Sequence, residues 1–247
     1  MRSDQTKKNT CLLITGCISP HSDVPYIKIN NKNEREKQYI DSLKFYIQNS
    51  MFDKIVFCDN SNAKPNSSVI ELAKKRGKQF EWLSFLGNVD ETVIHGKGYG
   101  EGEIIKYAVE NSKLIANSDY MVKVTGRIQV VNINTIVNGL SVDRAYFIAN
   151  SRKNIDTKVY AMSISVYNRY FKNAYLNVYD TKNIFLENLF RDVIHHNRLR
   201  FYCFSEYPNI QGVSGSTGET YSVSSIRRAL LLIRSNCIRL FFLVIGK

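Results

Sequence analysis

Residues 120–131 read YMVKVTGRIQVV, an apolar stretch that is interrupted by Thr125, Gly126 and Arg127. A short apolar run rich in β-branched residues predicts a buried strand. Burying an arginine costs free energy unless its charge is paired, so the interruption indicates that Arg127 faces a cleft at the end of this strand. There a guanidinium could bind a diphosphate by bidentate hydrogen bonds. An ordinary salt bridge at the strand end is the alternative.

Strands and helices are predicted to alternate around this central strand. The other predicted strands cover residues 11–18, 55–58, 80–85, 145–149 and 158–166, and the predicted helices cover residues 34–50, 67–77, 101–116 and 184–198. This alternation predicts one α/β domain with a mostly parallel sheet and helices on both faces. Ligands of such sheets bind at the carboxyl ends of the strands, which is where the polar clusters of this sequence fall.

The composition suits one folded domain with anionic partners. Of 247 residues, 44% are hydrophobic, and 34 Lys and Arg against 22 Asp and Glu give a net charge of +12. Such a charge favours nucleic acid, anionic lipid or phosphorylated substrates. Five cysteines without a CxxC pair argue against a zinc cluster and fit a reducing cytoplasm. The polar first ten residues lack the apolar core of a signal peptide.

Three further polar segments supply candidate binding residues. Asp59, Asn60 and Ser61 end the second strand, where a carboxylate could accept a hydrogen bond from a base or ribose, or simply form a turn. HGKGYGEGE (95–103) offers loop amides, a lysine and a helix N-terminus, the parts of a phosphate cradle, although P-loop and Rossmann spacings are absent; a mobile loop is the alternative. PNIQGVSGSTGETY (208–221) gathers hydroxyls and glycines that suit a polar ligand or an ordinary surface loop.

The candidate residues for ligand binding are thus Thr15, Asp59, Asn60, Ser61, Lys97, Gly98, Gly100, Lys123, Thr125, Gly126, Ser214, Ser216 and Thr217. Glu187, between apolar neighbours in IFLENLF (184–190), is the candidate general base, because an apolar environment raises a carboxyl pKa. Asp192 is a second candidate. A solvated helix face or a structural ion pair is the alternative for each.

Several of these motifs resemble those of GT-A glycosyltransferases. YMVKVTGRIQV resembles the strand in which that family carries an aspartate triplet at the place of Thr125, Gly126 and Arg127. FLENLF resembles the family's later LED motif, which supplies the catalytic carboxylate, here Glu187, with Asn188 in place of the aspartate. Together ITGCISP, QYIDSLKFYI, FCDNS, GKGYGEGE, KVTGR and GVSGSTGE resemble glycosyltransferases of bacterial surface-polysaccharide (O-antigen or capsule) gene clusters, over roughly residues 11–221.

The resemblance implies a single GT-A-like (Rossmann-like) domain over residues 1–225. It implies transfer of a hexosyl group from a nucleotide-diphosphate sugar to a hydroxyl of a lipid-linked glycan acceptor. The sequence has no DxD motif, so no divalent metal and no cofactor besides the donor are expected. Arg127, with Lys97 or Lys123, would then neutralise the leaving diphosphate, and Glu187 would serve as base in an inverting route.

Two other classes of protein compete with this interpretation. A nucleotidyltransferase should carry a GxGxR loop after the first strand, where this chain has TGCISP, and a non-catalytic nucleotide-sugar or glycan-binding protein remains open. Nucleic acid is not an expected partner, because the basic residues are scattered and no recognised motif is present.

Residues 226–247 are predicted to form a separate, dispensable amphipathic tail. From Arg227 to the end there are five basic residues and no acidic one. A central arginine costs on the order of 3 kcal/mol in a spanning helix, so we expect the tail to lie on anionic lipid at the inner face of the bacterial cell membrane. A helix docked on the domain is the alternative.

Overall fold

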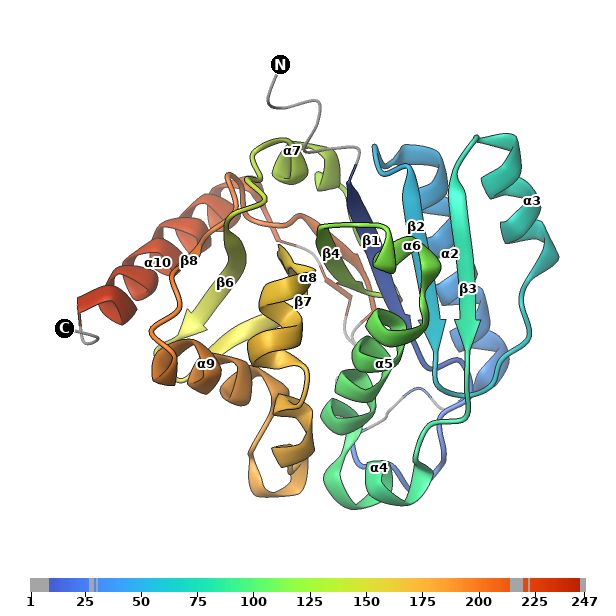
Figure 1. Ribbon diagram of the computed structural model, residues 1–247, viewed down its shortest axis with the longest axis horizontal. Coiled ribbons are helices and arrows are strands. Elements are labelled where there is room, and N and C mark those ends of the chain that lie inside the picture. Colours follow the sequence, from blue (N-terminus) through green and yellow to red (C-terminus); the bar gives the residue numbers. More distant parts are fainter. Residues whose placement is uncertain (1–8, 27–28, 30, 214–219, 222, 245–247) are drawn as a thin grey trace.

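The computed structural model describes residues 9–244 except 27–28, 30, 214–219 and 222. Its main sheet has seven strands in the order β3-β2-β1-β4-β7-β6-β8 (Figure 1). In that order the strands are β3 (Gln79–Ser84), β2 (Lys54–Asp59), β1 (Thr10–Gly16), β4 (Tyr120–Thr125), β7 (Asn154–Ser163), β6 (Ala145–Ser151) and β8 (Phe201–Tyr202). Only β7 runs against its neighbours in this sheet. The predicted α/β class, with a mostly parallel sheet and a C-terminal helix, is confirmed.

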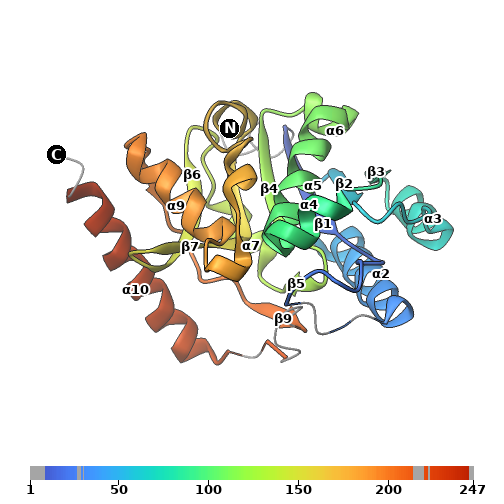
Figure 2. The ribbon, with the colours of Figure 1, turned by 90° about the horizontal axis from the view of Figure 1, so that it is seen from below.

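Both faces of the sheet are covered, as the uniform burial of β1 requires. Leu12 and Ile14 point into one core cluster, whereas Cys11 and Leu13 point into the other, because successive side chains of a strand alternate between faces. The first cluster is closed by α2 (Lys32–Asn49), α3 (Ser67–Lys75) and α7 (Ile133–Asn138), and the second by α5 (Lys97–Asn111), α6 (Lys113–Ala116) and α9 (Leu186–His196) (Figure 2). The chain also forms two short helices, α4 (Val89–His95) and α8 (Ile164–Val166).

The central segment forms two strands and not one. After β4 the chain turns, and β5 (Ile128–Val130) leaves the main sheet to pair with β9 (Ile210–Gly212), which lies within the glycine- and hydroxyl-rich segment 208–221. The turn is tight, because the Gly126 N–H donates to the Thr15 carbonyl at 2.9 Å and a Cβ on Gly126 would overlap that oxygen. Arg127 therefore lies at the corner between β4 and β5.

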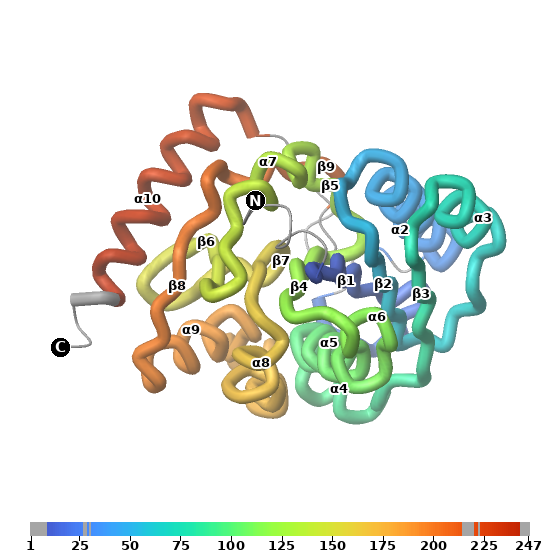
Figure 3. Tube along the Cα trace, turned by 45° about the horizontal axis from the view of Figure 1, so that its top comes forward, coloured from blue at the N-terminus to red at the C-terminus, as the bar shows by residue number. Residues whose placement is uncertain are grey.

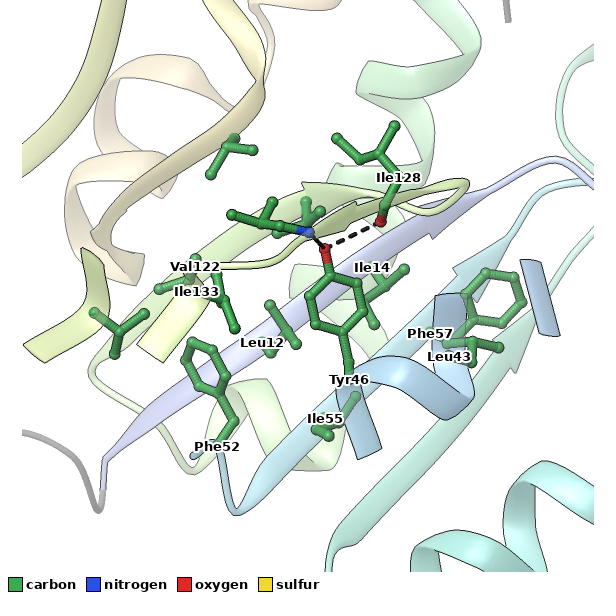
Figure 4. Close-up of a cluster of buried hydrophobic side chains, with 14 of the residues drawn as sticks. Leu12, Ile14, Leu43, Tyr46, Phe52, Ile55, Phe57, Val122, Ile128 and Ile133 are labelled. Carbon is green, nitrogen blue, oxygen red and sulfur yellow. Dashed lines mark hydrogen bonds between the residues drawn. The ribbon is translucent and has the colours of Figure 1, made fainter. Parts of the chain in front are cut away.

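A buried tyrosine on α2 fixes the position of β5. The Tyr46 hydroxyl donates to the Ile128 carbonyl at 3.0 Å and accepts from the Val130 N–H at 2.9 Å (Figure 4). Ser42, one turn earlier, donates to the same carbonyl at 2.9 Å. Since buried backbone groups must find partners, these bonds replace the ladder contacts that β5 loses on leaving the sheet. These hydrogen bonds fix the direction in which the chain leaves the sheet at Arg127.

Residues 97–103 of the glycine-rich segment are helical, so the expectation of a flexible loop before a helix at residue 101 or 102 is wrong. The helix α5 begins at Lys97. Its glycines are contact points, because Gly102 lies against Tyr175 and Gly98 against Asp180 and Val178, where a larger side chain would meet these neighbours. The absence of a Cβ thus allows close packing.

We predict that Gly102→Ala destabilises the protein by about 1–3 kcal/mol, because the new methyl group overlaps Tyr175. Urea unfolding followed by circular dichroism measures this. Gly100→Ala is the matched control in the same helix, since its Cβ would meet only the side chains of Asn60 and Thr92 at 3.3 Å. Equal stability of the two variants would contradict the packing role of Gly102.

The C-terminal helix α10 (Ser225–Val244) is docked on the outer edge of the sheet, along β6 and β8 (Figure 3). The buried Ser235 hydroxyl accepts the Ala149 N–H at 2.8 Å, and the Phe242 ring lies 5.7 Å from that of Phe201. This face of α10 packs against the core, so the described part of the tail is docked on the domain. Among the described residues, no helix combines the length and apolar character needed to cross a bilayer.

Candidate functional site

A cleft of about 600 Å³ opens at the carboxyl ends of β1, β2 and β4. The predicted site residues that line it are Thr15, Asn60, Ser61, Lys97, Gly100, Thr125, Arg127 and Glu187. The predicted Ser214, Ser216 and Thr217 lie outside the described residues, but Val213 and Tyr221 on either side of them line the same cleft. The fold thus brings together segments that are far apart in the chain.

One end of the cleft is cationic. Arg127 Nη1 donates to Gln38 Oε1 at 3.0 Å, and its guanidinium lies 5.9 Å from the centre of the Tyr39 ring. Burial lowers the pKa of Arg127, and neighbouring Arg35 lowers it further, while Tyr39 opposes both. Of the ion pairs found among the described residues, none involves Arg127 or Arg35. An unpaired, partly desolvated cation of this kind favours an anionic ligand.

Arg35 shapes the wall beside this end of the cleft. The side chain is buried, and it donates from Nε and Nη2 to the Cys17 carbonyl at 3.0 and 2.5 Å, and from Nη1 to the Ile29 carbonyl at 3.1 Å. Tyr39, one helical turn on, accepts the Cys17 N–H at 2.9 Å. Because carbonyl dipoles leave the guanidinium charge uncompensated, Arg35 adds to the positive potential around Arg127.

The other chemically distinct group in the cleft contains two carboxylates. Thr157 Oγ1 donates to Glu187 Oε1 at 2.9 Å. Burial raises the pKa of Glu187, and the nearby Glu101 and Asp156 carboxylates raise it further, while the hydrogen bond from Thr157 opposes this. Glu101 also lines the cleft. A carboxylate with a raised pKa is suited to accept a proton near neutral pH.

Lys123 is not placed as the sequence suggested. Its side chain is 0% exposed, and its ammonium donates to the Glu101 carboxylate, to Thr125 Oγ1 at 3.1 Å and to the Thr157 carbonyl at 2.7 Å. All three ammonium protons are engaged, so Lys123 cannot neutralise a diphosphate. Instead it holds Glu101 directly and supports Thr157, whose hydroxyl binds Glu187.

Three other predicted binding residues do not line the cleft. The Asp59 carboxylate is buried and accepts the N–H groups of Ile18, Ser61 and Ala63 at 2.7, 2.8 and 3.2 Å, so it shapes the loops after β1 and β2. The Gly98 N–H donates to Asp180 Oδ2 at 3.1 Å. An aspartate of the protein thus occupies the end of α5 at which the sequence suggested a phosphate. Gly126 is a buried turn residue.

Four residues of the site, Arg35, Gln38, Tyr39 and Glu101, are not among those predicted from the sequence. The spacing of the first three could have indicated this. Gln38 and Tyr39 lie three and four residues after Arg35 on the predicted 34–50 helix, so the three side chains share a face. Glu101 begins the predicted 101–116 helix, but its place in the site depends on Lys123 and Thr125, which are 22 and 24 residues away in the chain. No group of three or more His, Cys, Asp or Glu side chains that could hold a metal ion occurs in the described part of the chain.

No protein-family model and no curated protein matches the sequence. One solved structure, from Desulfovibrio desulfuricans G20 and provisionally described as a nucleotide-diphospho-sugar transferase, matches with a TM-score of 0.45 and 11% identity over 79% of each chain. HddC from Yersinia pseudotuberculosis matches with a TM-score of 0.31 and 12% identity, over 66% of this chain and 80% of that one. At these TM-scores neither likeness carries a functional argument.

We predict that Lys123→Met destabilises the protein by about 2–3 kcal/mol, which is below the roughly 3–5 kcal/mol typical of breaking a fully buried pair, because Glu101 is partly exposed to water. Chemical unfolding measures the loss. The double variant Lys123→Met with Glu101→Leu should recover much of the lost stability, because both charges are then removed and no carboxylate is left without its partner. A single variant as stable as the native chain would show that the pair does not stabilise the fold.

Proposed function

We propose that the protein is a glycosyltransferase that moves a hexosyl group from a nucleotide-diphosphate sugar to an acceptor hydroxyl. The observation that carries this proposal is the presence, within one cleft, of two groups: the Arg127 guanidinium, which has no ion pair among the described residues, and the Glu187 carboxylate, whose pKa is raised. The first suits a diphosphate, and the second suits a hydroxyl that must lose its proton.

The reaction follows from these two groups. Glu187 accepts the proton of the acceptor hydroxyl while that oxygen forms a bond to the anomeric carbon of the donor. The bond between that carbon and the diphosphate oxygen breaks, and the electron pair leaves with the nucleoside diphosphate. Arg127 stabilises the negative charge that develops on the leaving group, the role a divalent metal often plays. This route inverts the anomeric configuration.

The finer parts of the proposal rest on the sequence resemblance. They are an acceptor glycan carried on a lipid, a role in bacterial surface-polysaccharide synthesis, a position at the inner face of the cell membrane, and independence from a divalent metal. The absence of DxD and the position of Arg127 support the last of these. A non-catalytic sugar-nucleotide-binding protein is the competing function, and it would bind the donor with the same cationic end but release no nucleoside diphosphate over time.

We predict that Arg127→Ala weakens binding of UDP or GDP, whichever binds the native protein more tightly, by roughly 10–100-fold, because a charge-assisted hydrogen bond to a diphosphate is lost. Isothermal titration calorimetry measures the change, with and without EDTA. Arg144→Ala is the matched control, since it removes the same charge at a residue that stacks on Tyr202 and does not line the cleft. Binding that EDTA abolishes would contradict the role given to Arg127.

We predict that Glu187→Gln lowers kcat by roughly 10²–10⁴-fold while donor binding is kept. In the native enzyme the rate should fall as the pH drops through the pKa of Glu187, which lies above its ordinary value of 4.5, because the protonated acid cannot accept a proton. The variant should lose this acidic limb.

Asp192→Asn is the matched control for this experiment. Asp192 lies on the same helix, but it pairs with Arg191 at 2.7 Å and does not line the cleft, so its variant should keep the native rate and pH profile. A native rate in Glu187→Gln would remove Glu187 as the base. Donor binding without turnover in the native protein would favour the non-catalytic alternative.

A further inference from the structure

The docked helix α10 carries a second apolar face that no described part of the protein covers. Its exposed apolar residues include Ile226, Leu230, Ile233 and Leu240, which are 76%, 61%, 61% and 53% exposed, and Cys237 is also exposed. These five residues, the outer stripe, follow a repeat of four and three residues. Helical residues with this spacing share one face. The outer stripe therefore runs along the helix for roughly 21 Å, at 1.5 Å per residue.

The outer stripe lies opposite the face that docks on the sheet. Ser235, Ile238 and Phe242 contact the core, and at 100° per residue they lie about 120–180° around the helix from the stripe. Exposure of the stripe is therefore not a sign of loose docking. Five neighbouring positions are apolar on a face that is exposed in the monomer, which is typical of an interaction surface.

The charges beside the outer stripe all have the same sign. Arg227 and Arg234 are exposed and lie seven residues apart on one flank. On that flank the guanidinium of Arg152, from the turn between β6 and β7, lies 3.4 Å from the centre of the exposed Phe241 ring. Residues 225–244 contain no Asp or Glu. The stripe is thus bordered by cations that have no acidic counterpart on the same helix.

These charges favour an anionic lipid surface over a second copy of the chain. Two copies pairing through their stripes would gain no ion pair from the helices, since the residues at the matching positions of the other flank are Ala229 and Asn236. A bilayer with anionic headgroups accepts apolar side chains below the phosphates and cations at their level. We propose that α10 stays docked on β6 and β8 and seats the protein on anionic lipid through its outer stripe. This proposal is independent of the sugar-transfer reaction.

Co-sedimentation of the full chain with vesicles of phosphatidylcholine and an equal amount of phosphatidylglycerol tests it. The native protein should bind these vesicles, and Leu230→Glu with Ile233→Glu should weaken binding by about tenfold or more, because two charges replace inserted apolar groups. Leu176→Glu with Ile184→Glu is the matched control, since it makes the same exchange at two exposed apolar residues outside α10. The control should bind like the native chain. Melting followed by circular dichroism shows that both variants are folded.

The electrostatic contribution to vesicle binding is tested separately. Arg227→Ala with Arg234→Ala should weaken binding to the anionic vesicles, and added salt or vesicles of phosphatidylcholine alone should do the same. Bound vesicles should also slow labelling of Cys237 by a water-soluble maleimide. Native binding by the Leu230 and Ile233 variant would overturn the proposal. A second result would also overturn it: the native chain does not bind vesicles, and light scattering shows that it forms a dimer which the Leu230 and Ile233 variant does not form. Nucleoside-diphosphate binding, unchanged in all these variants, keeps this test separate from that of the cleft.

Discussion

The buried ammonium of Lys123 is the interaction on which the architecture of the site depends. It lies on the central strand β4 and satisfies its three protons on α5, on β4 itself and on β7, through Glu101, Thr125 and the Thr157 carbonyl. A buried charge is tolerated only when it is paired and fully hydrogen-bonded, so these three elements are held at one spacing. Lys123 therefore holds both carboxylates of the cleft. It binds Glu101 directly, and it supports Glu187 through Thr157, whose hydroxyl donates to Glu187.

A second constraint fixes the position of the Arg127 guanidinium. The chain must leave the sheet immediately after β4, because Gly126 touches the end of β1, and the polar groups of β5 are then satisfied by Tyr46 and Ser42 of α2. The same helix presents Gln38 and Tyr39 to the Arg127 guanidinium. One helix therefore fixes both the backbone corner and the side chain that projects from it. The cationic group and the carboxylate group are supported by different elements, α2 on one side of the sheet and α5 and α9 on the other.

The sequence predicted the fold better than it predicted the roles of individual residues. Continuous apolar runs marked β1, β2 and β4, and the polar interruption at Arg127 located the cleft, because burial patterns are a local property of the chain. Lys123 and Asp59 had the right chemistry for ligands, but their partners, Thr157 and Ile18, are 34 and 41 residues away in the chain. The glycines of α5 were misjudged for the same reason. Whether a glycine gives flexibility or close packing is decided by the residue facing it, here Tyr175 and Asp180.

The chain path links the cleft to the outer face of α10. Arg127 leads directly into β5, β5 pairs with β9, and the Tyr221 N–H returns to the Gly212 carbonyl at 2.9 Å, which holds Tyr221 at the cleft wall. The helix α10 starts four residues later, at Ser225, so at most about 14 Å of extended chain separates the cleft wall from that helix. Any surface that receives the outer stripe is therefore held close to the cleft. An acceptor anchored in that surface would then meet the donor at high effective concentration without needing strong contacts of its own, because confinement beside the cleft replaces part of the affinity that a free acceptor would require.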